Sequence, residues 1–466
     1  MPRAQVFASI GGASALMCVM PNIRETDTGA MIRAHSTSGG CTNTRDLVVA
    51  AIAVGVTLAV GLVALMFKTG EKKIEQTIAR LYDLKDDQFS RAMGVLLGPP
   101  NIAGNRFDVL LNGDEIFPSM LSAIRGAKQT ITFESYIYWS GAIGREFAEA
   151  LSERARAGVK VHVLLDWLGS SKLDSAQVAT MEKAGVIVRR FHEPAWYHLA
   201  RMNNRTHRKV LVVDGKVGFT GGVGIADVWS GHAQDPDHWR DTHFRAEGPV
   251  VAQMQAVFMD NWIKVTGEVL HGAEYFPPLE KRGDSTAQMF SSSPEGGSES
   301  MQLMYLLAIT AAAQSIHLSS AYFVPDDLSL KALVAAAKRG SACRSSRRGD
   351  TWTPKPCARH RAHAGATCSK PGSRSSNTSR RCTTARSMIV DGLWLSVGST
   401  NFDSRSFSLN DEANLNIFDA AFAGRQVAVF QQDLERSKAI TLAAWQQRPL
   451  VEKLLEHSAA LLRLQL

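Results

Sequence analysis

Cysteine is scarce in this chain, and its spacing argues against two kinds of structural crosslink. The 466 residues include six cysteines, of which only Cys18 and Cys41 lie outside residues 341–387. None of the six forms the short-spaced pair that zinc sites use. A disulfide framework and a structural metal are therefore not expected, and a reducing compartment suits the bulk of the chain.

Six of the apolar residue types that build a core are missing from residues 341–387. This segment has no Val, Ile, Leu, Met, Phe or Tyr, so it is not expected to form the two strands and the helix that the flanking pattern requires there. It holds nine Arg and two Lys against the single acid Asp350, a net charge of +10, whereas the remaining 41 basic and 43 acidic residues give −2. The overall charge of +8 is thus confined to one segment, which argues against a basic groove for nucleic acid.

One long hydrophobic run is present. Residues 47–67 read LVVAAIAVGVTLAVGLVALMF, 21 uncharged residues, and as a helix they would span about 32 Å, enough for a hydrocarbon core of roughly 30 Å. The run is too far from Met1 for an ordinary signal peptide, which predicts a retained single-pass anchor. Basic residues are more frequent after the run than before it, so the bulk of the chain is expected on the cytoplasmic side. These residues are Lys68, Lys72 and Lys73 after it, and Arg33 and Arg45 before it.

From Phe107 onward, strand-like apolar runs alternate with amphipathic helical segments. The first half predicts strands at 129–138, 159–166 and 186–191 and helices at 143–157 and 175–184, and residues 315–323 and 328–339 repeat the first strand and helix. Short helices between apolar strands predict an α/β fold with a mostly parallel sheet flanked by helices.

The repeated pattern predicts two similar lobes that share one site. Both halves close with the same signature, an apolar pair followed by Asp-Gly, at Asp214 in the first half and Asp391 in the second. The expected organisation is a polar N-terminal segment (1–46), a transmembrane helix (47–67), a connector (68–106), a first lobe (107–285) and a second lobe (286–466) that contains the anomalous segment 341–387.

The residues with the clearest chemical meaning are His207, Lys209 and Asp214, in the stretch Thr-His-Arg-Lys-Val-Leu-Val-Val-Asp. On a strand, His207 and Lys209 point to the same face, so an imidazole and an ammonium can meet at one phosphate. Phosphodiester exchange needs a nucleophile, an acid for the departing alkoxide and cations around phosphorus. Two His-x-Lys motifs would supply all three.

The second copy of this motif is incomplete. Thr384 and Arg386 stand where His and Lys are expected before Asp391. The length of the second half is kept although the motif is lost, which a shifted reading frame would explain; a disordered insertion is the alternative. When each codon's third base is read with the next codon's first two, residues 368–386 are compatible with LEAGVEIFEYQPTMYHGK or a close variant, which ends in His-x-Lys at the spacing of the first copy.

These motifs together resemble the phospholipase D superfamily, and specifically the bacterial cardiolipin synthases, from about Phe107 to the C-terminus except for residues 341–387. The stretches that carry the resemblance, besides the His207 motif, are Phe133–Tyr138 (FESYIY), His238–His243 (HWRDTH), Ala321–Pro325 (AYFVP) and Gly398–Ser406 (GSTNFDSRS). By this resemblance, His207 would attack phosphorus to form a phosphohistidine intermediate, and Lys209 would bind the phosphoryl oxygens.

The resemblance also implies the other members of the site. Asp241 is the candidate for orienting His207, and Glu412 matches the carboxylate that serves the second His. Asp214 and Asp391 complete the expected catalytic set as parts of the two motifs. The residues expected to contact the substrate are Gly222, Ser399 and Asn401.

The implied activity is that of a membrane-anchored phosphatidyltransferase that converts two phosphatidylglycerols into cardiolipin and glycerol without a metal or another cofactor. The expected location is the bacterial inner membrane, the expected partners are phosphatidylglycerol and membrane lipid, and the oligomeric state is left open. Without the second His, the chain as written is expected to be nearly inactive, because loss of general acid catalysis typically lowers a rate by about 10² to 10⁴. The alternatives are a phospholipase D-type hydrolase or nuclease and, in another class, a non-catalytic lipid-binding descendant of such an enzyme.

Overall fold

The computed structural model describes residues 44–67, 74, 76–193, 203–294, 298–347, 374–377 and 383–440. Two compact units are distinguished, one that ends at Leu58 and one that begins at Ala59. The predicted polar N-terminal segment falls almost entirely outside the described residues, as does most of the anomalous segment.

Helix α1 (Thr44–Phe67) contains the predicted hydrophobic run. The window from Thr44 to Gly61 has a mean hydropathy of 1.7, and none of it is buried in the structure. By length and composition, this helix is suited to cross a membrane.

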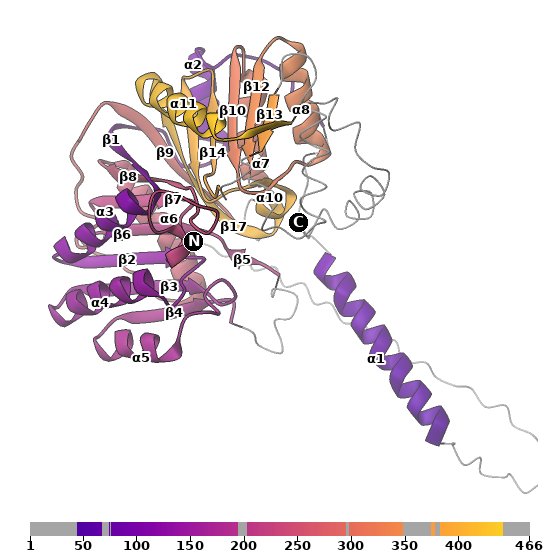
Figure 1. The fold of residues 1–466 in the computed structure, drawn as a ribbon, viewed down its shortest axis with the longest axis vertical. Coiled ribbons are helices and arrows are strands. Elements are labelled where there is room, and N and C mark those ends of the chain that lie inside the picture. Colours follow the sequence, from indigo (N-terminus) through magenta and orange to yellow (C-terminus); the bar gives the residue numbers. More distant parts are fainter. Residues whose placement is uncertain are drawn as a thin grey trace, which may run out of the picture. The chain divides into compact units, whose positions relative to one another are not determined.

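The remainder is one large mixed sheet covered by helices (Figure 1). The strands of the first half are β1 (Ile102–Leu111), β2 (Thr130–Ser135), β3 (Lys160–Asp166), β4 (Ile187–Phe191), β5 (Arg205–Thr206), β6 (Lys209–Val213), β7 (Val217–Gly221) and β8 (Thr242–Glu247). Those of the second half are β9 (Ser285–Ser292), β10 (Ser315–Ser320), β11 (Phe323–Val324), β12 (Ala342–Arg347), β13 (Arg374–Asn377), β14 (Ser387–Val390), β15 (Trp394–Gly398), β16 (Phe402–Asp403), β17 (Asn410–Phe418) and β18 (Lys438–Ile440). The helices are α2 (Asp87–Leu96), α3 (Asn112–Gly126), α4 (Ala142–Arg156), α5 (Ser175–Lys183), the 3-10 turn η2 (Asp227–Trp229), α6 (Val250–Thr266), α7 (Ser298–Ala311), α8 (Asp327–Lys338), α10 (Ser404–Ser408) and α11 (Ala420–Glu435).

The two halves share a single continuous sheet. Its strand order is β4-β3-β2-β6-β7-β8-β1-β9-β17-β15-β14-β10-β12-β13-β18, and β1 pairs with β8 on one side and β9 on the other. Along this path, parallel pairs are confined to β2, β3 and β4 in the first half and to β10, β12 and β13 in the second. The α/β architecture is confirmed, but the sheet is mixed rather than mostly parallel. The physical reason is that helices connect β2 to β3 and β3 to β4, whereas tight turns join β6 to β7 and β14 to β15 antiparallel.

Alternating side chains of the first half reach two separate helical layers. In β3, Val163 and Leu165 pack in the cluster that contains α3 and α4, while Leu164 packs with α6 residues such as Phe258 and Trp262. β3 is therefore buried on both faces, as its nearly continuous apolar sequence predicts. This rigid layer fixes where the strands end and hence where their terminal polar residues lie.

Strand formation within the anomalous segment is one outcome that the sequence did not predict. β12 runs parallel to β10 over six residues, in the same place relative to β10 that β3 has relative to β2. Its register puts buried Ser345 and Ser346 at the positions that Val163 and Leu164 occupy in the first half. The expectation of no strand here was wrong, because the main-chain bonds to β10 can form whatever the side chains are.

Candidate functional site

The segment that carries the motif in each half pairs with a strand end of the other half. β5 pairs in parallel with β17, and the backbone N–H of His207 donates to the carbonyl of Asp411 at 2.9 Å. In the second half, Thr383 bridges to Arg240, whose carbonyl accepts from the backbone N–H of Thr384 at 2.8 Å. The two motifs are thus held in the same way, each by the residue that precedes a carboxylate of the opposite half.

The carboxylate that contacts His207 is Glu412. The Nδ1 atom of His207 lies 2.9 Å from both Glu412 oxygens. Ser399 Oγ donates to the same carboxylate at 2.5 Å and Asn410 Nδ2 at 3.2 Å. The expectation that Asp241 orients His207 was wrong, because the His207 segment pairs with β17, which carries Glu412.

Burial and neighbouring cations favour a neutral imidazole at His207. Its pKa lies well below the ordinary value, first because the ring is buried and then because Lys209, Arg386 and Arg405 add positive charge nearby. Burial also raises the pKa of Glu412 to about 7, against the opposing charge of Lys209. Since a carboxylate accepts, Nδ1 of His207 carries the shared proton, and Nε2 keeps a lone pair for attack.

Lys209 lies next to His207, and both side chains contact Tyr136. Its Nζ donates to the carbonyl of His207 at 2.7 Å and lies 5.4 Å from the ring centroid of Tyr136, which also makes an edge contact with the imidazole. Burial, followed by the charge of Arg386, lowers the pKa of Lys209 well below its ordinary value. The mutual repulsion of Lys209 and Arg386 would be relieved by an anion bound near both.

Asp241 serves the second motif. Its carboxylate accepts from the hydroxyl of Thr384, which in turn accepts from Trp229 Nε1 at 2.8 Å. Asp241 is fully buried, and burial raises its pKa. Thr384 therefore occupies, on Asp241, the position that His207 occupies on Glu412.

Arg386 keeps a positive charge at the position of the missing Lys. Its Nη1 donates to the carbonyl of Thr384 at 2.7 Å, just as Lys209 donates to the carbonyl of His207. The same nitrogen donates to the carbonyl of Gly222 at 3.1 Å, and Nε donates to Asn401 Oδ1 at 3.0 Å. The second motif has thus lost its imidazole but not its cation.

The three residues predicted on the substrate side are all brought to this site. Gly222 leaves no room for a side chain, because a Cβ there would lie 2.4 Å from the Thr384 carbonyl and 2.5 Å from Asp241 Oδ1. Ser399 contacts Glu412, and Asn401 contacts Arg386. A direct contact of these residues with substrate stays a prediction.

Asp214 and Asp391 have a different environment from the one expected of catalytic residues. Each adopts a left-handed backbone conformation, with φ of 52° and 54°, at the end of its strand remote from the His or Thr. The Asp214 carboxylate accepts from the backbone N–H groups of residues 128, 129 and 130, and Asp391 accepts from those of 313, 314 and 315. Both are repeated turn residues that fasten a hairpin to the start of the neighbouring strand.

Replacing Asp214 is therefore expected to affect folding more than turnover. Asp214→Ala should lower the free energy of unfolding by roughly 2 to 4 kcal/mol, because backbone donors lose their acceptor and Ala at positive φ is strained. Asp214→Asn should lower it by about half as much, since Asn keeps one acceptor and tolerates this conformation. Urea denaturation measures both. A fully folded Asp214→Asn protein without turnover would show instead that the carboxylate takes part in the chemistry.

Two aromatic residues of the site were not predicted individually. Tyr136 follows β2 and packs against His207, and Trp229 in η2 donates to Thr384. Tyr136 could have been found from the sequence, because it directly follows a buried parallel strand, where binding residues of α/β proteins gather. Trp229 gave no such signal.

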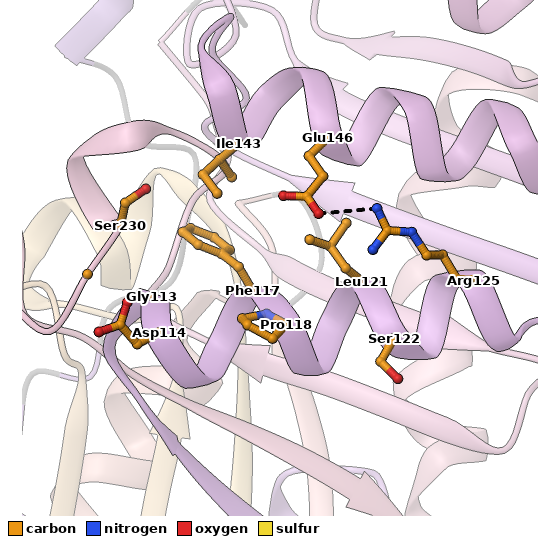
Figure 2. A pocket seen from close by; sticks show the side chains of 11 residues that line it. Gly113, Asp114, Phe117, Pro118, Leu121, Ser122, Arg125, Ile143, Glu146 and Ser230 are labelled. Carbon is orange, nitrogen blue, oxygen red and sulfur yellow. Dashed lines mark hydrogen bonds and ion pairs between the residues drawn. The ribbon is translucent and has the colours of Figure 1, made fainter.

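A cavity of about 540 Å³ lies between α3 and α4 (Figure 2). Figure 2 shows Phe117, Leu121 and Ile143 on its apolar wall and the Arg125–Glu146 ion pair at one end. Its opposite rim contains Ser230 and Gly231, which follow Trp229 in the chain. The rim thus lies next to the residue that holds Thr384.

The sequence of this chain is similar to those of known proteins. Residues 120–231 and 305–434 match the family model described as cardiolipin synthase, PLD-like domain. A probable cardiolipin synthase of Bacillus subtilis is 32% identical over 413 residues, which cover 85% of this chain and 81% of that protein. A cardiolipin synthase of Geobacillus sp. is 33% identical over 359 residues, or 76% of this chain and 71% of that protein.

The fold also has a solved counterpart. The crystal structure of a phosphatidylserine synthase from Haemophilus influenzae matches with a TM-score of 0.63 at 14% identity, and the match covers 81% of this chain and 100% of that one. At this identity the likeness concerns the fold. The residues matched by the family model include His207, its partner Glu412 and the second motif from Thr384 to Asp391. By the extent of these matches, the chain belongs to the cardiolipin synthase family of phospholipase D-type phosphatidyltransferases.

Proposed function

We propose that this chain transfers a phosphatidyl group between two phosphatidylglycerols, with His207 as the nucleophile. The observation that carries the proposal is the contact of His207 Nδ1 with both Glu412 oxygens, which leaves Nε2 free for attack. Lys209 and Arg386 supply the positive charge that a phosphoryl group needs as charge develops on its oxygens.

The proposed reaction has two displacements. In the first, Nε2 of His207 attacks phosphorus, a P–N bond forms, and the P–O bond to the glycerol headgroup breaks, so that glycerol leaves after it takes up a proton. In the second, the terminal hydroxyl of another phosphatidylglycerol attacks the same phosphorus, loses its proton, and the P–N bond breaks. The products are cardiolipin and glycerol, and His207 is regenerated.

Proton transfer to the departing alkoxide is the weak step in this chain. The hydroxyl of Thr384 does not ionise near neutral pH, so it cannot serve as a general acid where an imidazole could. The proton must come from water, and we expect slow turnover that the intact Glu412, His207 and Lys209 still direct to phosphatidylglycerol.

The membrane is the proposed source of substrate. Helix α1 suits a single crossing of the bacterial inner membrane, and the lysines at 68, 72 and 73 favour a cytoplasmic position for the remainder of the chain. An anchored enzyme meets phosphatidylglycerol in the bilayer without extracting it into water.

The experiment that tests the function compares two substrates. Detergent-solubilised full-length protein is incubated with phosphatidylglycerol vesicles labelled in the glycerol headgroup, and in parallel with labelled single-stranded DNA. We expect slow formation of cardiolipin with release of one labelled glycerol for each cardiolipin, and intact DNA. Phosphatidic acid as the sole lipid product would indicate a hydrolase, and cleaved DNA a nuclease.

The pH dependence should follow Glu412. Because burial raises the pKa of Glu412 to about 7, its carboxyl becomes protonated as the pH falls through 7, and the hydrogen bond that orients His207 weakens. We therefore expect kcat/KM to rise with pH through about 7 rather than near 4.5, the unperturbed value. Glu412→Gln should remove this inflection and lower kcat/KM at pH 8 by roughly 10- to 10²-fold.

The matched control for this pH profile is Glu280→Gln, since the Glu280 side chain is 82% exposed. It should keep the profile of the parent chain. An inflection near pH 7 that survives in Glu412→Gln would assign the titration to another group and contradict the proposed role.

A second candidate function is non-catalytic binding of lipid phosphate. It is favoured by Thr384, because a threonine hydroxyl cannot exchange a proton as an imidazole would, and this one is bonded to Asp241 and Trp229. This candidate predicts saturable binding of phosphatidylglycerol vesicles with no cardiolipin, even after an imidazole is introduced at position 384.

A further inference from the structure

The two residues that flank His207 are both fully buried and both polar. Thr206 and Arg208 have no exposed surface, and they bond to different parts of the molecule. The segment that carries the nucleophile is therefore held on both sides, apart from the contact of His207 itself with Glu412.

Thr206 is held by three side chains. Its hydroxyl donates to Glu134 Oε1, and its backbone N–H donates to Asp166 Oδ2 at 3.1 Å. Asn261 Nδ2 donates to the same Glu134 oxygen at 2.8 Å and lies 3.2 Å from the Thr206 hydroxyl. Glu134 is fully buried and accepts two hydrogen bonds on one oxygen, while its other oxygen has no partner among the described residues.

Arg208 is held by α6 and the end of β9. One guanidinium nitrogen donates to the carbonyl of Val257 at 2.9 Å, and the other donates to Asp260 at 2.9 Å and to the carbonyl of Ser292 at 3.4 Å. Together with the Glu134 cluster, these bonds fix the main chain immediately before and after His207.

Among the described residues of the second half, the positions equivalent to Glu134, Thr206 and Arg208 hold other side chains. Asp214 binds the amide of Thr130 as Asp391 binds that of Ser315, and by this equivalence Ser319 stands where Glu134 stands in the first half. Likewise Thr383 stands in place of Thr206, and Ala385 in place of Arg208. The Ser319 side chain is too short to reach Thr383 as the Glu134 carboxyl reaches Thr206. Ala385 has no polar side-chain atom with which to make the hydrogen bonds that Arg208 makes.

We propose that Glu134, acting through Thr206, is a positioning residue that fixes the His207 imidazole for attack. The inference rests on the proposed function and adds to it the residues that hold the nucleophile in place. A displacement of about 1 Å in a reacting group can lower a rate roughly 10²-fold, so rigid flanking residues matter for a nucleophile that attacks phosphorus in line. A general acid on the opposite side tolerates more freedom, because a proton can be passed at hydrogen-bond distance.

Two substitutions of Glu134 distinguish the effect of its hydrogen bonds from the effect of its side-chain volume. Glu134→Gln keeps an acceptor oxygen for Thr206 and Asn261, whereas Glu134→Met has a similar length and no acceptor. Glu149→Met is the control, since Glu149 is an exposed residue of α4. Histidine acylation and cardiolipin synthesis are both measured on the full-length protein, and thermal unfolding is recorded for each variant.

The primary measurement does not require turnover. Diethyl pyrocarbonate acylates neutral imidazoles, and mass spectrometry gives the rate for each histidine separately. We expect Glu134→Met to change the acylation rate of His207 at least threefold while His317, a buried histidine of the second half, keeps its rate; Glu134→Gln and Glu149→Met should match the parent. In the cardiolipin assay, Glu134→Met should lower kcat about 10- to 10²-fold with KM within twofold of the parent.

Each outcome decides the inference. An unchanged His207 rate and unchanged kcat in Glu134→Met would overturn it, as would a parallel rise in the His317 rate, which would mark a general loss of structure. If the parent and all variants make no cardiolipin, the proposed function fails, but a selective change at His207 that Glu134→Gln does not show still supports the positioning role.

Discussion

A protein that carries Thr384→His together with Arg386→Lys is expected to form cardiolipin roughly 10² to 10⁴ times faster than the parent chain. The physical reason is that an imidazole at position 384 can donate its proton to the departing glycerol, which the Thr384 hydroxyl cannot do. Asp241 already lies beside this position and accepts from Thr384, so it is placed to orient the introduced ring. Initial rates of labelled cardiolipin formation measure the effect.

This gain must depend on His207. The same double substitution in a His207→Gln background should give no product above the uncatalysed level, because a general acid without a nucleophile cannot form the intermediate. A folded double variant with no gain in rate would show that the second half has lost more than its imidazole. That result would favour non-catalytic binding of lipid phosphate.

The cause of the missing imidazole has its own test. The nucleotide sequence from codon 340 to codon 388 either contains compensating shifts of the reading frame or does not. Buried Ser345 and Ser346 at positions that hold Val163 and Leu164 in the first half agree with a scrambled strand at this place. If the frame is clean, Thr384 and Arg386 are native residues and the low-activity enzyme described above is the natural protein.

His207→Gln should have the largest effect of any single substitution. We expect a loss of roughly 10⁴-fold or more, because the amide can accept from neighbouring donors but cannot form the phosphorus–nitrogen intermediate. The matched control is His271→Gln, at an exposed position in the loop after α6, which should keep the parent rate. Acid-quenched protein should also contain a histidine-linked phosphatidyl group in the parent and none in His207→Gln.

The loss must be separated from unfolding. His207 is buried, and its backbone N–H is bonded to Asp411, a bond that Gln can also make. The thermal transition of His207→Gln should therefore stay within a few degrees of the parent. Retention of cardiolipin synthesis in a folded His207→Gln protein would sink the proposed mechanism.

The sequence was a good guide to elements and to motif positions. The predicted ranges match β3, β4 and the helices α4, α5 and α8 within one residue, whereas β2 and β10 end three residues before the predicted ranges do. The signal is clearest in β3, which is buried on both faces and is apolar at nearly every position. The spacing of His207 and Lys209 and the repeat at Asp391 identified both halves of the site. By contrast, the mixed pairing of the sheet was not predicted, since hairpin strands are as apolar as crossover strands.

The sequence by itself determined that this protein has a duplicated α/β body with one complete His-x-Lys motif, one incomplete copy, and a hydrophobic run long enough to cross a membrane. Only the tertiary structure decided which carboxylate serves which motif. Asp241 and Glu412 both follow polar residues near a strand end. The residues around them in the sequence do not indicate which strand the His207 segment will join. Each motif is served by a carboxylate of the opposite half because β5 pairs with β17 and Thr383 pairs with Arg240. Both contacts join residues that are far apart in the chain. The structure likewise removed Asp214 and Asp391 from the expected catalytic set, because their left-handed turns direct both carboxylates to backbone amides of the neighbouring strand rather than to the site.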